Sequence, residues 1–106
     1  MRKLILTAGC IAALSIGRAQ AQDDLAAKGK EVFEQCGVCH NTDTDEKKIG
    51  PSMKGLYQRE KLKNGKPVND ANVLAVINAG GGGMPSYSDT LSDDEKKQVI
   101  AYLKTL

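Results

Sequence analysis

The feature that most constrains this chain is the stretch Cys36-Gly37-Val38-Cys39-His40. Two cysteines three positions apart, followed directly by a histidine, are typical of a site that attaches a c-type haem. On a helical turn, positions i and i+3 share one face, so both thiols can reach the two vinyl groups at one haem edge. His40 is the only histidine in the chain. The motif therefore predicts one haem c bound through Cys36 and Cys39, with His40 as a ligand of its iron.

Three other interpretations of the motif explain less of the sequence. A thioredoxin-like redox pair needs a strand-helix-strand setting, and no such pattern flanks the motif. A structural zinc ion usually takes four Cys or His ligands, whereas only Cys36, Cys39 and His40 are present outside the N-terminal segment. A simple disulfide leaves the adjacent histidine unexplained. These arguments favour haem attachment.

The chain opens in the manner of a secretory signal peptide. Met1-Arg2-Lys3 precedes an apolar run of 14 residues from Leu4 to Gly17, and Ala19-Gln20-Ala21 has the form of a cleavage site. The run is shorter than the ~20 residues that span a bilayer. We therefore predict a signal peptide over residues 1–21, export to the periplasm, and a mature domain over residues 22–106.

A lipoprotein signal is the alternative, since Thr7-Ala8-Gly9-Cys10 ends in a cysteine. Only the residues from Leu4 to Ala8 separate the basic start from Gly9, and the apolar region of a signal peptide usually has about 7–15 residues. We therefore expect Cys10 to be removed with the signal. The mature protein is expected to carry no lipid anchor and to make no stable membrane insertion.

Removal of the signal reverses the charge of the chain. Arg2, Lys3 and Arg18 are lost, so the 15 basic residues become 12 against 13 acidic residues, and the net charge changes from +2 to −1. The charge of the whole chain is thus no argument for nucleic-acid binding. The remaining 85 residues, with one Phe, three Tyr and no Trp, predict a single thin domain that needs a cofactor to complete its core.

Apolar periodicity and capping residues predict an all-α domain. Asn69 or Asp70 can cap a helix that ends at Gly80, and Ser92 with Glu95 forms a capping box. Neither strand alternation nor an internal repeat is visible. The expected helices are Leu25 to about Cys36, a short piece within Ser52 to Gln58, Ala71 to Ala79, and a last helix from Ser92 to the end.

Glycines mark two places where the backbone must bend or approach another group. Gly29 lies inside the first predicted helix, four residues before Phe33, where a bare backbone lets a second helix come close. The run from Gly80 to Gly83 leads into Met84-Pro85. Proline biases the residue before it toward an extended conformation, which helps Met84 to project its side chain.

With these motifs, the whole mature region resembles the mono-haem class I c-type cytochromes. The resemblance implies an all-α fold of about four short helices wrapped around one covalently attached haem. It also implies that the N- and C-terminal helices cross, with Tyr102 packed over Gly29. The domain is expected to be a monomer.

The resemblance further implies the remaining site residues. In the family, the proline carbonyl at the position of Pro51 receives the histidine ring N–H, and the arginine at Arg59 lies near a propionate. Met84 is implied as the distal iron ligand, although Met53 is a second candidate. Met84 lies on a glycine-hinged loop, whereas Met53 follows Pro51 closely. The expected cofactor-binding residues are therefore Cys36, Cys39, His40, Pro51, Arg59 and Met84, with His40 and Met84 on the iron.

The implied function is that of an electron carrier, not an enzyme, working between redox partner proteins in a respiratory or dehydrogenase-linked chain. Two alternatives stay open. One is a five-coordinate c-haem sensor or peroxidase-like enzyme, in which Met84 does not bind the iron. The other is a dedicated haem subunit of a dehydrogenase or oxidase. The basic stretch from Arg59 to Asn69 is either a docking patch or a solvated loop.

Overall fold

The computed structural model describes residues 20–106, so the predicted signal peptide lies outside the described residues except for its last two positions. Its helices are an N-terminal helix over residues 20–32, α2 (Asp70–Ala79) and α3 (Asp93–Leu103), with two short 3-10 turns, η1 (Phe33–Gln35) and η2 (Leu56–Gln58). In this part of the chain no strand forms, and two isolated bridges join Lys61 to Pro67 and Gly81 to Met84. The all-α fold class is confirmed.

Capping residues begin α2 and α3, and end α2, where the sequence predicts. The Asn69 side chain accepts a hydrogen bond from the backbone N–H of Asn72 at 2.8 Å, and Gly80 ends α2 with a φ of 65°. Ser92 and Glu95 form both halves of the capping box at the start of α3. The last helix stops at Leu103, short of the chain end that the sequence predicted.

The N-terminal helix ends earlier than expected, and η1 and two hydrogen-bonded turns follow it. The backbone N–H groups of Cys36 and Gly37 donate to the Phe33 carbonyl at 2.8 and 2.9 Å. Those of Cys39 and His40 donate to the Cys36 carbonyl at 3.1 and 3.0 Å. The motif residues therefore lie on successive tight turns directly after η1, not on the α-helix itself.

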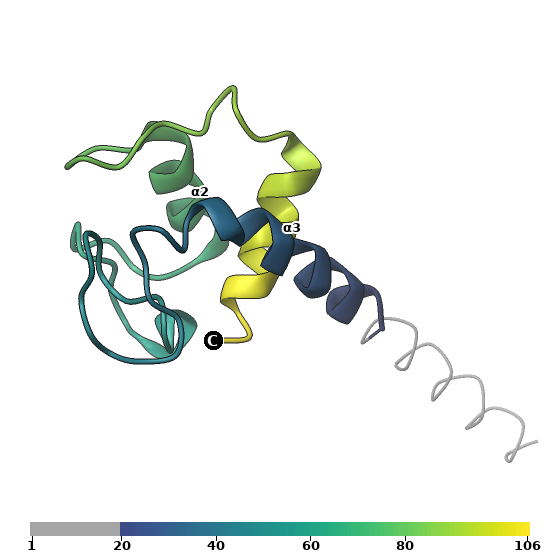
Figure 1. Cartoon of the computed structure of the whole chain (residues 1–106), viewed down its shortest axis with the longest axis horizontal. Helices are drawn as coiled ribbons and strands as arrows, with labels where there is room; N and C mark the ends of the chain where they lie inside the picture. The colour runs from purple at the N-terminus through teal and green to yellow at the C-terminus, as the bar shows by residue number, and fades with distance from the viewer. Residues whose placement is uncertain (1–19) are drawn as a thin grey trace, which may run out of the picture.

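The N-terminal helix crosses α3 at Gly29 (Figure 1). A Cβ atom on Gly29 would lie 1.9 Å from the Gln98 carbonyl oxygen and 2.8 Å from Tyr102 Cβ. Beside the crossing, the rings of Phe33 and Tyr102 pack at 5.3 Å between centroids with a 54° tilt, a favourable aromatic arrangement. The predicted crossing is confirmed, and glycine is what allows this close approach.

The core is a small cluster shared by the helices and turns. Its buried members are Phe33, Leu56, Val73, Ile77, Leu91, Val99, Ile100 and Leu103. None of the large side chains in residues 20–106 is completely buried. Two irregular segments, 36–55 and 80–91, lie against this core and carry most of the predicted site residues. Across residues 20–106, no helix is long and apolar enough to cross a membrane.

Candidate haem site

The backbone of the loop after the motif holds the His40 ring. His40 Nδ1 donates a hydrogen bond to the Pro51 carbonyl oxygen at 2.7 Å, which leaves Nε2 as the ring atom able to bind a metal. A Cβ on Gly50 would lie only 2.4 Å from His40 Cε1. The N–H of Gly50 donates to the Cys39 carbonyl at 2.7 Å. The Gly50-Pro51 turn thus sets both the tautomer and the orientation of the imidazole.

Cys36 and Cys39 are half-buried free thiols. Burial, with an added effect of the neighbouring Cys39 thiol, raises the pKa of Cys36, so this sulfur stays protonated at neutral pH. Over residues 20–106, no three His, Cys, Asp or Glu side chains gather as a metal site would require. Two thiols and one imidazole on adjacent turns therefore fit the attachment of a haem better than a structural zinc ion.

Arg59 stabilises the segment that follows Pro51. Its guanidinium donates to the backbone carbonyls of Ser52 at 3.1 Å and Lys54 at 2.7 Å. The hydroxyl of Ser52, which is buried, donates to the Thr44 carbonyl. The structure thus shows Arg59 bracing the Pro51 segment, while its approach to a haem propionate stays a prediction.

Met84 comes from a separate part of the chain and stands at the end of a closed turn. All four glycines from Gly80 to Gly83 have positive φ values, which residues with a Cβ rarely adopt. Gly81 and Met84 exchange backbone hydrogen bonds of 2.9 and 3.1 Å. Met53, by contrast, is partly buried against the hydrophobic core. Met53 therefore has a packing role that accounts for it, which favours Met84 as the ligand.

The structure places two polar groups near the Met84 turn that sequence reasoning missed. Burial, and then the nearby cysteines 36 and 39, raise the pKa of Tyr87, so its hydroxyl lies within electrostatic range of both thiols. Asn78 Oδ1 is buried with no hydrogen-bond partner among residues 20–106. A buried polar atom normally has a hydrogen-bond partner, either a protein group or an ordered water molecule. The position of Tyr87 just after Met84-Pro85 was a usable signal, whereas nothing in the sequence distinguished Asn78.

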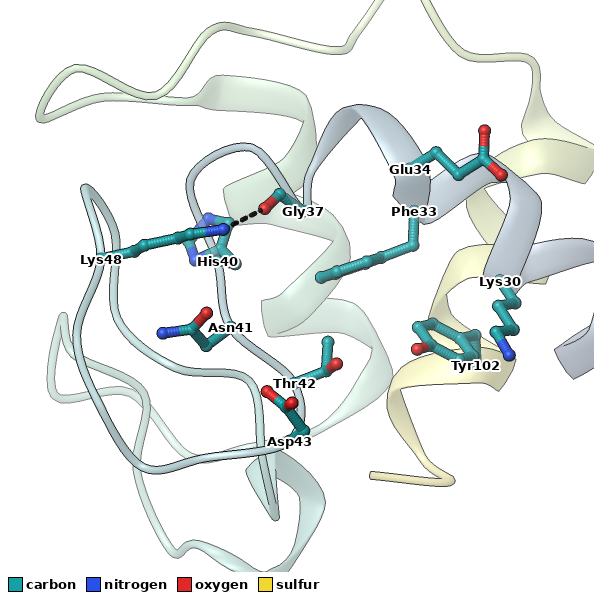
Figure 2. Close-up of a pocket in the computed structure, with 10 residues that line it drawn as sticks. All are labelled: Lys30, Phe33, Glu34, Gly37, His40, Asn41, Thr42, Asp43, Lys48 and Tyr102. Carbon is teal, nitrogen blue, oxygen red and sulfur yellow. Dashed lines mark hydrogen bonds between the residues drawn. The ribbon is translucent and has the colours of Figure 1, made fainter.

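An open cavity of about 350 Å³ lies beside the motif (Figure 2). Figure 2 shows the Lys48 side chain extending past His40, and its Nζ donates to the Gly37 carbonyl at 3.0 Å. The lining comprises Lys30, Phe33, Glu34, Gly37, His40, Asn41, Thr42, Asp43, Lys48 and Tyr102. It includes His40 but neither cysteine of the motif nor Met84. This cavity is therefore not the place where the predicted cofactor residues meet.

Comparison with known proteins found a matching family and several relatives. Residues 24–103 match the family described as "Cytochrome C oxidase, cbb3-type, subunit III". The chain is 43% identical over 74 residues to cytochrome c2 of Blastochloris viridis, covering 68% of this chain and 56% of that protein. It is 30% identical over 135 aligned positions to cytochrome c2 of Rhodospirillum rubrum, covering 100% and 99% of the two chains.

A third relative is cytochrome c6 of Synechocystis sp., at 36% identity over 90 residues, which covers 84% of this chain and 71% of that protein. This chain thus spans about half the length of the Blastochloris relative and almost all of the Rhodospirillum one. Covalently bound haem c is the shared property of such proteins. From the family match, the relatives and the all-α fold, the chain belongs to the small class I c-type cytochromes.

Proposed function

We propose that this protein is a one-electron carrier that holds a single haem c through Cys36 and Cys39, with His40 and Met84 as axial ligands. The observation that carries the proposal is the hydrogen bond from His40 Nδ1 to the Pro51 carbonyl. It commits the ring to a tautomer whose Nε2 is available to iron, on the same turns as both thiols. The haem, when bound, supplies the reversible Fe(III)/Fe(II) couple.

The two proposed ligands, His40 and Met84, influence the iron in different ways. Donation of the His40 N–H to the Pro51 carbonyl fixes the ring orientation and raises the basicity of the ligating nitrogen. The thioether of Met84 is a soft ligand that favours the reduced iron and raises the potential. Two ligands positioned in advance by turns keep the change in structure between oxidation states small, as electron transfer requires.

The same residues argue against an enzyme. With His40 and Met84 both on the iron, no coordination position is open to a substrate. His40 is also the only histidine in the chain, so none is left to act as a distal proton shuttle of the kind that peroxide chemistry usually uses. We therefore propose transfer of electrons between protein partners, with no catalysed reaction of a small substrate.

Carbon monoxide binding to the reduced protein tests this function. We expect rapid, reversible reduction by ascorbate, low-spin spectra in both oxidation states, and negligible CO binding at neutral pH, because Met84 holds the sixth position. Stoichiometric CO binding without unfolding would contradict the carrier proposal. It would support the five-coordinate sensor or peroxidase-like alternative instead.

We further propose that the carrier works as a monomer in the periplasm, after loss of residues 1–21, and binds no nucleic acid. The support is the signal-peptide pattern at the N-terminus and the net charge of −1 that remains after its removal. The intact mass of the exported protein should equal residues 22–106 plus one haem, without lipid. A mass that begins at an acylated Cys10 would show a membrane-anchored lipoprotein.

A second candidate is a dedicated haem subunit of a respiratory oxidase. The description of the family that matches residues 24–103 names such a subunit. Size-exclusion chromatography of the native protein, extracted gently from its own cells, separates the two candidates. A free carrier elutes at the mass of the mature domain, whereas a subunit elutes with its larger complex.

A further inference from the structure

Among residues 20–106, Lys96 is the charged residue whose side chain is buried together with the core. It lies in α3, three residues before the buried Val99, and only 8% of its surface is exposed. Its ammonium donates a hydrogen bond to the Ser88 carbonyl oxygen at 2.9 Å. The salt bridge found within residues 20–106 joins Lys104 to Asp70 and does not involve Lys96. Burying an ammonium costs free energy unless its donors form hydrogen bonds, so the burial of Lys96 needs an explanation.

The acceptor of this bond lies on the segment that carries Met84. We call residues 84–91 the Met84 strap, which bridges from the turn after α2 to the start of α3 (Figure 1). It contains neither helix nor strand. At its α2 side, the Tyr87 N–H donates to the Ile77 carbonyl at 3.0 Å, and Ser86 Oγ donates to the Asn78 carbonyl at 2.5 Å. At its α3 side, the Ser88 carbonyl of the strap accepts a hydrogen bond from the Lys96 side chain of α3.

The N-terminal end of the strap offers points at which the backbone can turn. The four glycines at positions 80–83 precede it, and a Cβ on Gly81, Gly82 or Gly83 would meet no other atom within 4 Å. The other end is fixed, because Ser92 is held as the N-cap residue of α3 by both hydrogen bonds of the capping box. The Lys96 bond acts on Ser88, between these ends and four residues after Met84. A hydrogen bond from a charged donor is stronger than a neutral one, so it opposes local opening of the strap.

We propose that Lys96 is a positioning residue that holds the Met84 strap closed and thereby keeps the Met84 sulfur on the iron. This inference rests on the proposed function, because it takes Met84 as the distal ligand. It assigns the buried ammonium to control of loop opening. The ammonium is not needed for the global stability of the domain, because an apolar side chain at this position would stabilise the core at least as well.

Imidazole binding to the ferric protein tests the inference, because imidazole occupies the iron position that Met84 leaves. We expect Lys96→Leu to bind imidazole about tenfold more tightly than the wild type, the factor expected from losing one hydrogen bond to a charged group. The melting temperature of Lys96→Leu should stay equal or rise. The matched control is Lys97→Leu, the exposed neighbour on the same helix, which should bind imidazole as the wild type does.

Three results would overturn the inference. They are an unchanged imidazole affinity in Lys96→Leu, an equal increase in Lys97→Leu, and an increase in Lys96→Leu that accompanies a matching loss of global stability. The wild-type ferric spectrum separates this failure from failure of the proposed function. If the methionine-to-iron charge-transfer band is missing from the wild type, Met84 is not the ligand and the proposed function is wrong. If the band is present and the affinities are equal, only the role of Lys96 is wrong.

Discussion

The two proposed iron ligands, His40 and Met84, depend on different kinds of local structure. His40 is held from two sides, by the Pro51 carbonyl at 2.7 Å and by the bare backbone of Gly50 against its ring. Met84 lies on a turn that closes through its own hydrogen bonds to Gly81. Replacement of His40 would remove a ligand from a rigid pocket, whereas Met84 can be changed with little effect on the surrounding core.

Met84→Ala and Met53→Leu should therefore behave differently. We predict that Met84→Ala abolishes the methionine-to-iron charge-transfer band and lowers the reduction potential. Met53→Leu should keep both, because Met53 packs against the core and a leucine of similar volume usually costs less than ~1.5 kcal/mol. Absorption spectra and potentiometric titrations measure the outcome. A band that survives Met84→Ala and disappears in Met53→Leu would assign the distal position to Met53.

Among the helices, the N-terminal helix and α3 approach each other closely at Gly29. The Gln98 backbone carbonyl lies where a Cβ of residue 29 would go, so neither helix can yield by turning a side chain aside. Phe33 and Tyr102 pack beside this point. The crossing thereby sets the distance between the helix that leads into the motif and the helix that closes the domain.

Gly29→Ala should thus destabilise the protein although alanine favours helices. Overpacking costs ~1–3 kcal/mol, and ~1 kcal/mol lowers the melting temperature of a domain this size by about 4–8 °C. Thermal unfolding followed by circular dichroism measures the effect. Ala27→Gly, at an exposed position of the same helix, is a control that loses helix propensity without touching the crossing. An unchanged melting temperature in Gly29→Ala would mean that the helices do not meet at this residue in solution.

A second contact between elements joins η2, α2 and α3. Asp70, at the start of α2, accepts hydrogen bonds from the Tyr57 hydroxyl and from Lys104 Nζ, both at 2.9 Å. The hydrogen bond from Lys104, followed by that from Tyr57, holds the pKa of Asp70 below its usual range. Because the folded protein favours the charged carboxylate, this contact stabilises the fold above the unfolded pKa and is lost as the pH falls through the folded pKa.

Asp70→Asn should accordingly lower the melting temperature at pH 7, and the difference from wild type should shrink below about pH 4. The side chains of Lys104 and Asp70 are 40% and 58% exposed, so we expect a contribution of no more than ~1 kcal/mol. Asp89→Asn, in the exposed segment before α3, is the control. A difference that stays constant from pH 7 to pH 3 would exclude the carboxylate charge as its source.

At the scale of the whole molecule, the described part of the chain has a small core, and we expect it to need a crosslink for stability. The predicted mature region has 85 residues, and no large side chain within residues 20–106 is completely buried. Domains of this size commonly need a covalent or metal crosslink. The proposed haem would act as that crosslink, joining the turns after the N-terminal helix to the Met84 strap.

The double variant Cys36→Ala/Cys39→Ala, which cannot attach a haem covalently, should therefore lose most of its helical structure. Far-ultraviolet circular dichroism of the purified variant measures the loss. Val38→Ala is the matched control, because Val38 lies between the two cysteines, is 67% exposed, and leaves both thiols in place. Native helicity with a cooperative unfolding transition in the double variant would show that the polypeptide folds without the cofactor.

Much of the fold and site follows from the sequence, because it depends on residues within one or two turns of each other. The spacing of Cys36, Cys39 and His40 defines a haem motif at any point of a fold. Asn69 caps α2 through the backbone of Asn72, three residues away. Gly29 in the first helix predicted a helix crossing, because two helix backbones can approach this closely only where a side chain is absent.

What the sequence left open was decided by contacts between distant segments. Met53 and Met84 are both candidate ligands by sequence, and the structure adds that Met53 is partly buried against the core. Arg59 is expected near a haem propionate, and in the structure its guanidinium donates hydrogen bonds to the backbone carbonyls that follow Pro51. A lysine near the start of a polar helix predicts an exposed side chain, yet Lys96 is buried because the strap lies over it and offers the Ser88 carbonyl. Only the tertiary structure brings an acceptor to a donor in this way, since burial is a property of the packed elements and not of the residue.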